Sequence, residues 1–312
     1  MSYVVKKMSE RVDFNNRVSD MANLYNESEP RSLGARNLIS RRRFALEMLE
    51  SGLSHPLKIL DAGCGTGEIV GQLIRHGHEV WGLDISEAMI RYAKENCAVG
   101  RFQHGDIEHL PFRDNTFDVV VCLGVLEYLN TSENALREII RVLKPGGRAV
   151  ISTPNATFPL YYVDRALVGL KVAVWPLYRF LKYSSGGRPA PAHQSPKEIF
   201  HRRYYPGRWL RLLSSVGLEP QESVCHGWGW YRTWHLELLL HFLSRLGGMF
   251  RHSLGRFLGR SLLNRAVDGI VRNRALNWLL SEQIVRVRAV KKPVSPQLCW
   301  MVAAMNATFV IL

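Results

Sequence analysis

Cysteines are few in this chain, and no two are close together in the sequence. Five occur among 312 residues, at wide spacing: Cys64, Cys97, Cys122, Cys225 and Cys299. None of them has the Cys-x-x-Cys spacing typical of zinc sites, and an odd number of scattered cysteines does not form a disulfide framework. The sequence therefore predicts neither structural disulfides nor a metal site.

We also expect neither a secretory leader nor a clear membrane-spanning segment. Residues 1–10 have no apolar stretch, so we expect no secretory signal and a cytoplasmic protein. Residues 158–183 are rich in aromatic and aliphatic side chains, but charged residues interrupt them, which argues against a spanning helix. The tail at 293–312 is uncharged but diluted by polar residues; a segment packed on the domain or a frayed tail is favoured over a membrane anchor.

Acidic residues are in short supply relative to basic ones. The chain has 27 Asp and Glu against 41 Lys and Arg, a formal net charge of +14. Such an excess favours an anionic partner, either nucleic acid or a membrane surface. Hydrophobic residues make up 46% of the chain, which is enough for a substantial core.

The most informative feature that is present is a glycine-rich turn after a short apolar segment. Residues 58–61 are typical of a strand buried on both faces, and Gly63, Gly65 and Gly67 lead into a helical stretch. Glycine lacks a Cβ atom, so the backbone can turn tightly and let a ligand come close. The turn predicts a nucleotide-like cofactor at the end of a parallel sheet.

The acids at this turn restrict the kind of cofactor. A dinucleotide-binding turn would have glycine at position 68, where this chain has Glu68, and Asp61 adds a second negative charge. Both acids would repel a pyrophosphate and would suit a cofactor that carries an amine and a positive centre. S-adenosylmethionine has this chemistry.

Residues 58–154 resemble the catalytic domain of the class I S-adenosylmethionine-dependent methyltransferases, in the branch that includes the ubiquinone and menaquinone biosynthesis enzymes. The similarity follows five segments in order, at 58–67, 80–86, 105–112, 117–123 and 143–153. It implies an α/β fold with a Rossmann-like seven-stranded sheet. Beyond that sheet we expect a helical cap and a helical insertion between the last two strands.

The resemblance also implies where the cofactor binds. Asp84 would end the second strand, where one carboxylate can accept two hydrogen bonds from a ribose diol. Asp106 would accept a hydrogen bond from the adenine amine, and Ile107 would pack on the ring. The implied contacts are Asp61, Gly63, Gly65, Gly67, Asp84, Ile85, Asp106, Ile107 and Leu123.

Plainer explanations stay open for several of these residues. The three glycines could form a purely structural turn, and Asp84 could be the N-cap of a helix that starts at Ser86. Asp106 could be a solvated loop acid. Arg41, Arg42 and Arg43 lie in an expected helix over residues 38–53; we interpret them as a solvated face, with an anion-binding role as the alternative.

The remaining segments complete the predicted organisation. A helix is expected at 209–218, a sixth strand near 222–225 and a seventh near 283–290, with the fifth strand at 148–153. The expected units are a helical preface at 1–55, the cofactor-binding core at 56–154, an acceptor cap with the sixth strand at 155–231, a basic amphipathic helical insertion at 232–282, and the last strand with an uncharged tail at 283–312.

The predicted insertion contains a segment that favours contact with a membrane surface. In residues 245–274 arginines alternate with large apolar side chains, against a single acid, Asp268. This pattern is typical of an amphipathic surface for anionic lipid headgroups, although a core helix with a solvated arginine side would look the same. It favours a protein that lies peripherally on the inner membrane face.

These features predict a methyltransferase that acts on O or C of a small lipophilic acceptor. An RNA acceptor is the weaker alternative, because residues 123–127 lack the Asn/Asp-Pro-Pro-aromatic signature of base-amine methylation. A catalytically silent S-adenosylmethionine-binding module is the third. No general base is singled out among the candidates Glu127, Tyr128, His193, His201, Tyr204 and Tyr205.

Overall fold

The fold is described from a computed structural model of the chain. The described residues are 33–50, 56–158, 202–226 and 280–290, together with Phe14, Val18, Ser19, Met21 and Ala22. The predicted aromatic cap, the basic surface at 245–274 and the tail at 293–312 lie outside these residues. The division of the chain into five units stays a prediction.

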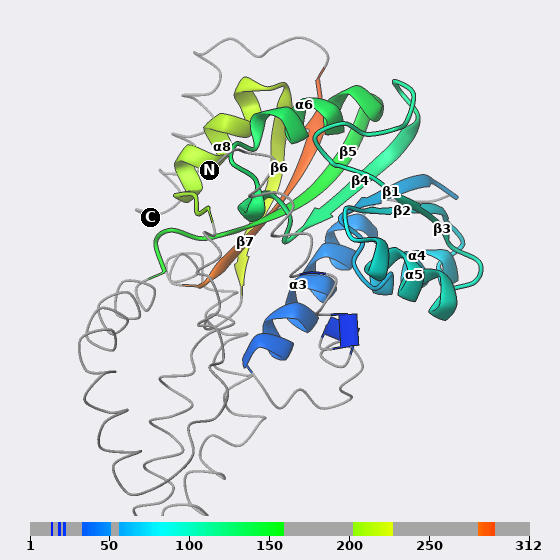
Figure 1. The fold of residues 1–312 in the computed structure, drawn as a ribbon. Coiled ribbons are helices and arrows are strands. Elements are labelled where there is room, and N and C mark those ends of the chain that lie inside the picture. Colours follow the sequence, from blue (N-terminus) through cyan, green and yellow to red (C-terminus); the bar gives the residue numbers. More distant parts are fainter. Residues whose placement is uncertain are drawn as a thin grey trace, which may run out of the picture.

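A seven-stranded sheet with the order β3-β2-β1-β4-β5-β7-β6 forms the centre of the fold (Figure 1). Its strands are β1 (Lys58–Ala62), β2 (Glu79–Asp84), β3 (Arg101–His104), β4 (Phe117–Leu123), β5 (Leu143–Pro154), β6 (Leu218–His226) and β7 (Glu282–Ala289). The pairs from β3 to β5 are parallel, and β7 is antiparallel to both of its neighbours. The carboxyl ends of β1, β2 and β4 therefore meet at one edge of the sheet.

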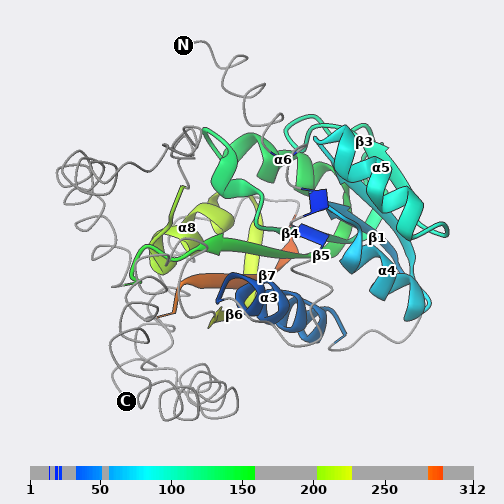
Figure 2. The same cartoon turned by 60° about the horizontal axis from the view of Figure 1, so that its bottom comes forward.

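Helices cover both faces of this sheet, which makes three layers (Figure 2). On one face α6 (Glu133–Val142) and α8 (Pro206–Ser215) pack against the apolar side chains of β1, β4 and β5. On the other, α3 (Leu33–Glu50), α4 (Glu68–Arg75) and α5 (Glu87–Asn96) do so. A short 3-10 helix, η1 (Leu126–Tyr128), follows β4.

The central strands form where the sequence is almost continuously apolar. Six of the seven residues of β4 are buried, because helices cover both of its faces. In α6, Leu136, Ile139 and Val142 recur at helical spacing and are fully buried. Each such side chain contributes about 2 kcal/mol by leaving water, so these layers hold the strand ends in fixed positions.

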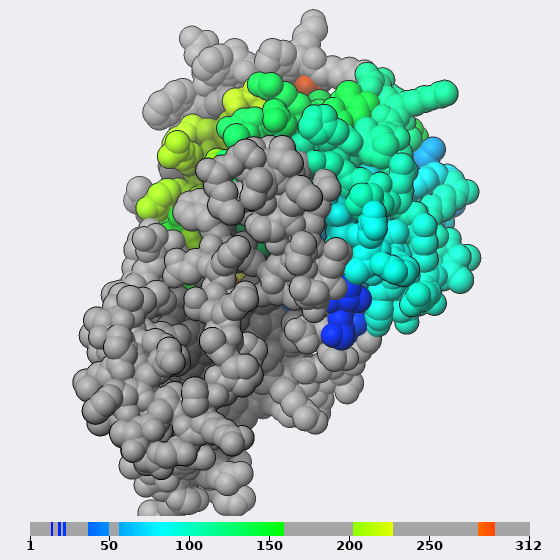
Figure 3. Space-filling model, viewed as in Figure 1, coloured from blue at the N-terminus to red at the C-terminus, as the bar shows by residue number. Residues whose placement is uncertain are grey.

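Two helices begin close to the carboxyl ends of β1 and β2, where the candidate site lies. Helix α4 starts after Gly67, which has a left-handed φ of 84°. Helix α5 starts after Ser86, whose Oγ accepts a hydrogen bond of 3.2 Å from the backbone N–H of Met89. In the space-filling view, the teal residues around α5 and β3 form one flank of the molecule and the green residues of α6 and β5 another (Figure 3).

The predicted seven-stranded sheet is confirmed, with corrections to several elements. The sheet is mixed and not wholly parallel, because β7 runs against β5 and β6. Strand β5 begins at Leu143, not at 148, because Leu143 already pairs with Phe117. The helix expected at 209–218 is α8, which ends at Ser215, and Leu218 already belongs to β6, which is longer than the expected 222–225.

The segment before the sheet forms a helix as expected, with shifted bounds. It spans residues 33–50 and not 38–53. No helix in the described part of the chain combines the length and the apolar character needed to cross a membrane.

Candidate cofactor site

The glycine-rich turn after β1 is held against the end of β2. The backbone N–H groups of Gly63 and Cys64 both donate to the carbonyl oxygen of Leu83, at 2.6 and 3.0 Å. Gly63 has a φ of 91°, and a Cβ atom there would overlap with Cγ2 of Val125. At Gly65 a Cβ atom would meet nothing within 4 Å. The turn is thus tightly packed on one side and open at Gly65, where a ligand can reach the backbone.

Asp84 connects this turn to the start of α5. Its Oδ2 accepts a 2.9 Å hydrogen bond from the N–H of Gly65, and its Oδ1 accepts one of 2.9 Å from the N–H of Ser86. The side chain that caps α5 is Ser86, so the N-cap alternative for Asp84 is wrong. Each carboxylate oxygen still has a second lone pair, so Asp84 can also accept bonds from ligand hydroxyl groups.

Asp61 lies at the carboxyl end of β1 and is buried. Its pKa is raised to about 7, chiefly by burial and also by the neighbouring Asp84, while the Arg41 guanidinium opposes both effects. The pKa of Asp84 is raised as well, mainly by burial. The site therefore holds two carboxyl groups whose charged forms would be favoured by a positively charged ligand.

The loop after β3 lies beside Asp84. The N–H of Gly105 donates to the backbone oxygen of Asp84 at 2.9 Å, so Asp106 and Ile107 are held next to the end of β2. Oδ1 of Asp106 accepts a 3.0 Å bond from the N–H of Glu108, and Ile107 is buried. Asp106 is therefore a half-buried residue that orders its own loop, and contact with an adenine stays a prediction.

The predicted contacts come together at a single edge of the sheet. Leu123 ends β4 next to β1, and Ile85 follows Asp84 directly, half-buried. The glycine turn joins β1 to α4, and the other predicted contacts follow β2 and β3. Their positions are thus compatible with one bound molecule, although the individual contacts stay predictions.

Arg41 is a buried member of this region that we interpreted as solvated, and that interpretation is wrong. Its Nη1 donates to Oε1 of Glu282 at 2.9 Å, and both side chains are nearly inaccessible. Arg42 lies 3.5 Å from Glu68, and only Arg43 of the three is exposed. The signal was present in the sequence, because position 41 shares a helix face with the buried residues Leu38 and Ala45.

A buried polar cluster extends from Arg41 toward the last strands. Oε2 of Glu282 lies 3.5 Å from Nε2 of His226, and Ser152 Oγ lies 3.5 Å from Oε1 of Glu282. Burial lowers the pKa of His226 to about 4, so this imidazole is neutral at pH 7. The sequence analysis missed Glu282 and His226, because nothing in a lone acid or histidine near a strand end indicates burial.

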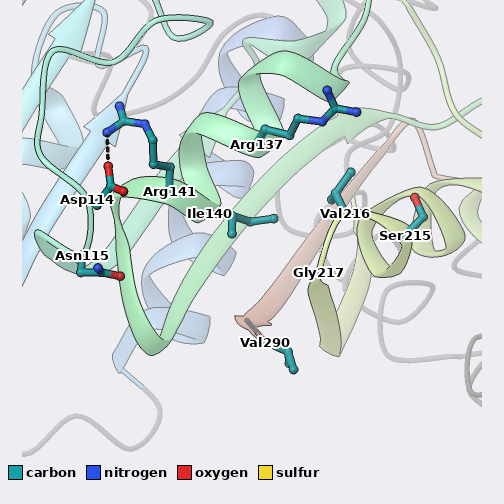
Figure 4. A pocket seen from close by; sticks show the side chains of 9 residues that line it. All are labelled: Asp114, Asn115, Arg137, Ile140, Arg141, Ser215, Val216, Gly217 and Val290. Atoms are coloured by element: carbon teal, nitrogen blue, oxygen red, sulfur yellow. Dashed lines mark hydrogen bonds and ion pairs between the residues drawn. The ribbon is translucent and has the colours of Figure 1, made fainter. Parts of the chain in front are cut away.

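A cavity of about 460 Å³ lies at the opposite edge of the sheet (Figure 4). Asp114, which is paired with Arg141 at 2.8 Å, lies before β4, and Val290 follows β7. Because β4 begins here and β7 ends here, this cavity is remote from the glycine turn. It does not belong to the candidate cofactor site.

Comparison with known proteins identifies the central part of the chain. Residues 60–151 match the family described as "Methyltransferase domain". Residues 60–151 form a methyltransferase domain. The predicted resemblance to the class I S-adenosylmethionine-dependent methyltransferases is confirmed for this part.

Curated proteins similar to this chain extend the match around the methyltransferase domain. A malonyl-[acyl-carrier protein] O-methyltransferase of Erwinia pyrifoliae is 44% identical over 97 residues, which cover 31% of this chain and 37% of that protein. A ubiquinone biosynthesis O-methyltransferase of Rickettsia felis is 35% identical over 170 residues, which cover 53% of this chain and 62% of that protein. The matches thus span less than two thirds of these relatives.

A solved structure supports the fold over a longer stretch than the methyltransferase domain. The magnesium protoporphyrin IX methyltransferase of Synechocystis, solved with bound SAH, has a TM-score of 0.57. The comparison covers 91% of this chain and 99% of that one, at 14% sequence identity. At this identity the likeness shows the Rossmann-like fold and nothing about the acceptor.

The residues of the methyltransferase domain fit S-adenosylmethionine chemically. The open position at Gly65 gives access to the backbone of the turn, and the lone pairs of Asp84 can take hydroxyl donors. Burial, followed by the neighbouring Asp84, raises the pKa of Asp61 and disfavours its charged form, which a cationic ligand would stabilise. No phosphate-binding feature is needed for such a ligand.

Proposed function

We propose that the chain is an S-adenosylmethionine-dependent methyltransferase that acts on O or C of a small lipophilic acceptor. The observation that carries the proposal is the pair of acids at neighbouring strand ends around the glycine turn. Asp84 accepts a hydrogen bond from Gly65 inside that turn, and Asp61 lies beside it in a buried position. This arrangement favours a nucleoside with a positive centre.

The residues of this chain act chiefly by orienting the two reactants and by excluding water from them. Asp84 would orient the ribose hydroxyls, and Asp61 would favour the cationic end of the cofactor, which supplies the methyl group. The glycine turn allows close approach, and the buried ends of β1 and β4 exclude water. Orientation and desolvation of this kind can supply most of the acceleration in a displacement reaction.

The lipophilic acceptor is supported by two independent indications. The Rickettsia felis relative is named for ubiquinone biosynthesis, and the sequence contains the aromatic segment 158–183 and the arginine-rich segment 245–274. Both segments have the composition of elements that meet apolar molecules or anionic lipids. We therefore place the acceptor at or in a membrane surface on the cytoplasmic side.

Methyl transfer from labelled cofactor tests the proposal. The full chain would be incubated with methyl-labelled S-adenosylmethionine and either a total lipid extract or total RNA. We expect label in the lipid fraction, a loss of at least tenfold for Asp84→Asn, and no loss for the matched change Asp114→Asn. Label in RNA alone would replace the lipid acceptor with the RNA alternative, and label in neither fraction would contradict the proposal.

A further inference from the structure

Glu127 follows β4 on a segment that contacts the glycine turn through Val125. Gly124, with a left-handed φ of 69°, turns the chain out of the strand, and Val125 then packs over Gly63. Helix η1 begins at the next residue and carries Glu127. The segment that carries Glu127 is thus held against the glycine turn by the contact of Val125 with Gly63.

The carboxyl group of Glu127 is buried, and one of its two oxygens lacks a hydrogen-bond partner among the described residues. The residue is 4% exposed, and Oε2 has no hydrogen-bond partner within the described part of the chain. Its backbone oxygen accepts a 2.9 Å bond from the N–H of Arg202, which keeps the segment in place. A buried carboxyl oxygen without a partner costs free energy unless a ligand uses it.

Several charged groups act on Glu127, but none of those in the described part of the chain forms a hydrogen bond with its Oε2. Burial raises its pKa to about 7, although Arg41 from α3 lowers it; Glu282 on β7 raises it and Arg203 lowers it. Arg41 is already bonded to Glu282 at 2.9 Å. Burial raises the pKa of Cys122 on β4, and the charges of Glu127 and Asp61 raise it as well, so both carboxyl groups lie within electrostatic reach of this residue.

We infer that Glu127 accepts the proton of a hydroxyl acceptor during methyl transfer, an inference that rests on the proposed function. The acceptor oxygen bonds to the methyl carbon while the bond from that carbon to sulfur breaks, and its electron pair stays on sulfur as a neutral thioether. The hydroxyl proton passes to Oε2 of Glu127 and then to water. A base whose pKa lies near the working pH is well suited to this step.

The inference also narrows the class of acceptor. A hydroxyl group, such as a phenol or an enol, has a proton that must leave when its oxygen is methylated. A carboxylate acceptor has none at neutral pH and would not need Glu127. Among oxygen acceptors, the buried carboxyl group therefore favours a weakly acidic hydroxyl group over a carboxylate.

A pH profile of an isosteric variant tests this role. Wild type, Glu127→Gln, Glu127→Asp and the exposed control Glu95→Gln would be assayed as full chains with labelled S-adenosylmethionine and total lipid extract. Glu127→Gln should lower kcat by roughly 10²–10⁴-fold and remove the rise in rate around pH 7, with cofactor affinity unchanged. Glu127→Asp should restore part of the rate, and Glu95→Gln should match wild type.

A second readout does not depend on turnover. The infrared difference between wild type and Glu127→Gln should contain the band of a protonated carboxyl group that disappears with a midpoint near pH 7. An unchanged pH profile in Glu127→Gln, or loss of cofactor binding in that variant, would overturn the role of Glu127 alone. Absence of any transfer by wild type would instead overturn the proposed function, and this inference with it.

Discussion

Gly63 and Gly65 lie two positions apart in the same turn, yet they have different surroundings. At Gly63 a Cβ atom would overlap with Val125 and φ is 91°, whereas at Gly65 φ is 51° and the space is open. We predict that Gly63→Ala lowers the free energy of unfolding by roughly 2–4 kcal/mol, and Gly65→Ala by about 1 kcal/mol. Urea unfolding of both variants checks this.

The two variants also differ in their expected effect on ligand binding. Gly65→Ala should retain most of its stability and still lose affinity for S-adenosylmethionine, because its methyl group occupies the open side of the turn. Equal stability losses in the two variants would contradict the packing described for this turn. Unchanged affinity in Gly65→Ala would contradict its contact with the cofactor.

Asp61 makes stability depend on pH. Its pKa is raised from 3.8 to about 7, so the folded state binds a proton more tightly, and this stabilisation is lost as pH rises from about 4 to 7. Asp61→Asn removes the effect. Relative to wild type, the variant should gain roughly 2–3 kcal/mol between pH 5 and pH 8, since one pKa unit corresponds to about 1.4 kcal/mol.

Urea unfolding at a series of pH values measures this difference. Asp114→Asn is the matched control, because the Asp114 side chain is exposed and lies at the opposite edge of the sheet. Parallel stability curves for wild type and Asp61→Asn would show that Asp61 is not a desolvated carboxyl group beside Asp84.

Individual residues of the site differ in how far the sequence could predict them. The positions of Asp61 and Asp84 followed from their places at the ends of apolar strands, and those of the glycines from the turn after the first of these strands. Arg41 was misread, because three consecutive arginines resemble a solvated face and only their register against Leu38 and Ala45 separates the buried one. Glu282 and His226 could not be found, because their burial depends on contacts between residues distant in sequence.

At the scale of elements, a buried ion pair joins α3 to the sheet. Arg41 lies on α3 and Glu282 begins β7. Removing one partner leaves a buried charge, so Arg41→Met should lower the free energy of unfolding by about 3–5 kcal/mol. The double variant Arg41→Met with Glu282→Gln should recover much of this loss.

A double-mutant cycle in urea provides the measurement. Arg43→Met is the control on the same helix, since its side chain is half exposed, and it should have little effect. Additive effects of Arg41→Met and Glu282→Gln would contradict an energetic link between α3 and β7.

Strands could be predicted where burial on both faces of the sheet gives a continuous run of apolar residues in the sequence. Strand β4 was placed at its observed bounds for this reason. Strand β6 was placed too short, because Glu219 and Gln221 are polar and β6 is an edge strand of the sheet. The antiparallel direction of β7 depends on the path of the chain between β6 and β7, which a local pattern does not encode.

At the scale of the whole molecule, the net charge of +14 predicts an electrostatic contribution to membrane binding. The full chain should cosediment with vesicles that contain anionic lipids and should be released as salt rises, because screening weakens each near-surface charge. Vesicles of neutral lipid are the control. Equal binding to both kinds of vesicle, or binding to neither, would contradict an anionic membrane surface as partner.

Titration calorimetry of the full chain with S-adenosylmethionine is the most direct test of the cofactor site. Asp84 and Asp61 at adjoining strand ends predict saturable binding of one molecule per chain, with affinity at least tenfold weaker for Asp84→Asn and unchanged for Asp114→Asn. No saturable binding by the wild-type chain, or equal affinity in Asp84→Asn, would contradict the account.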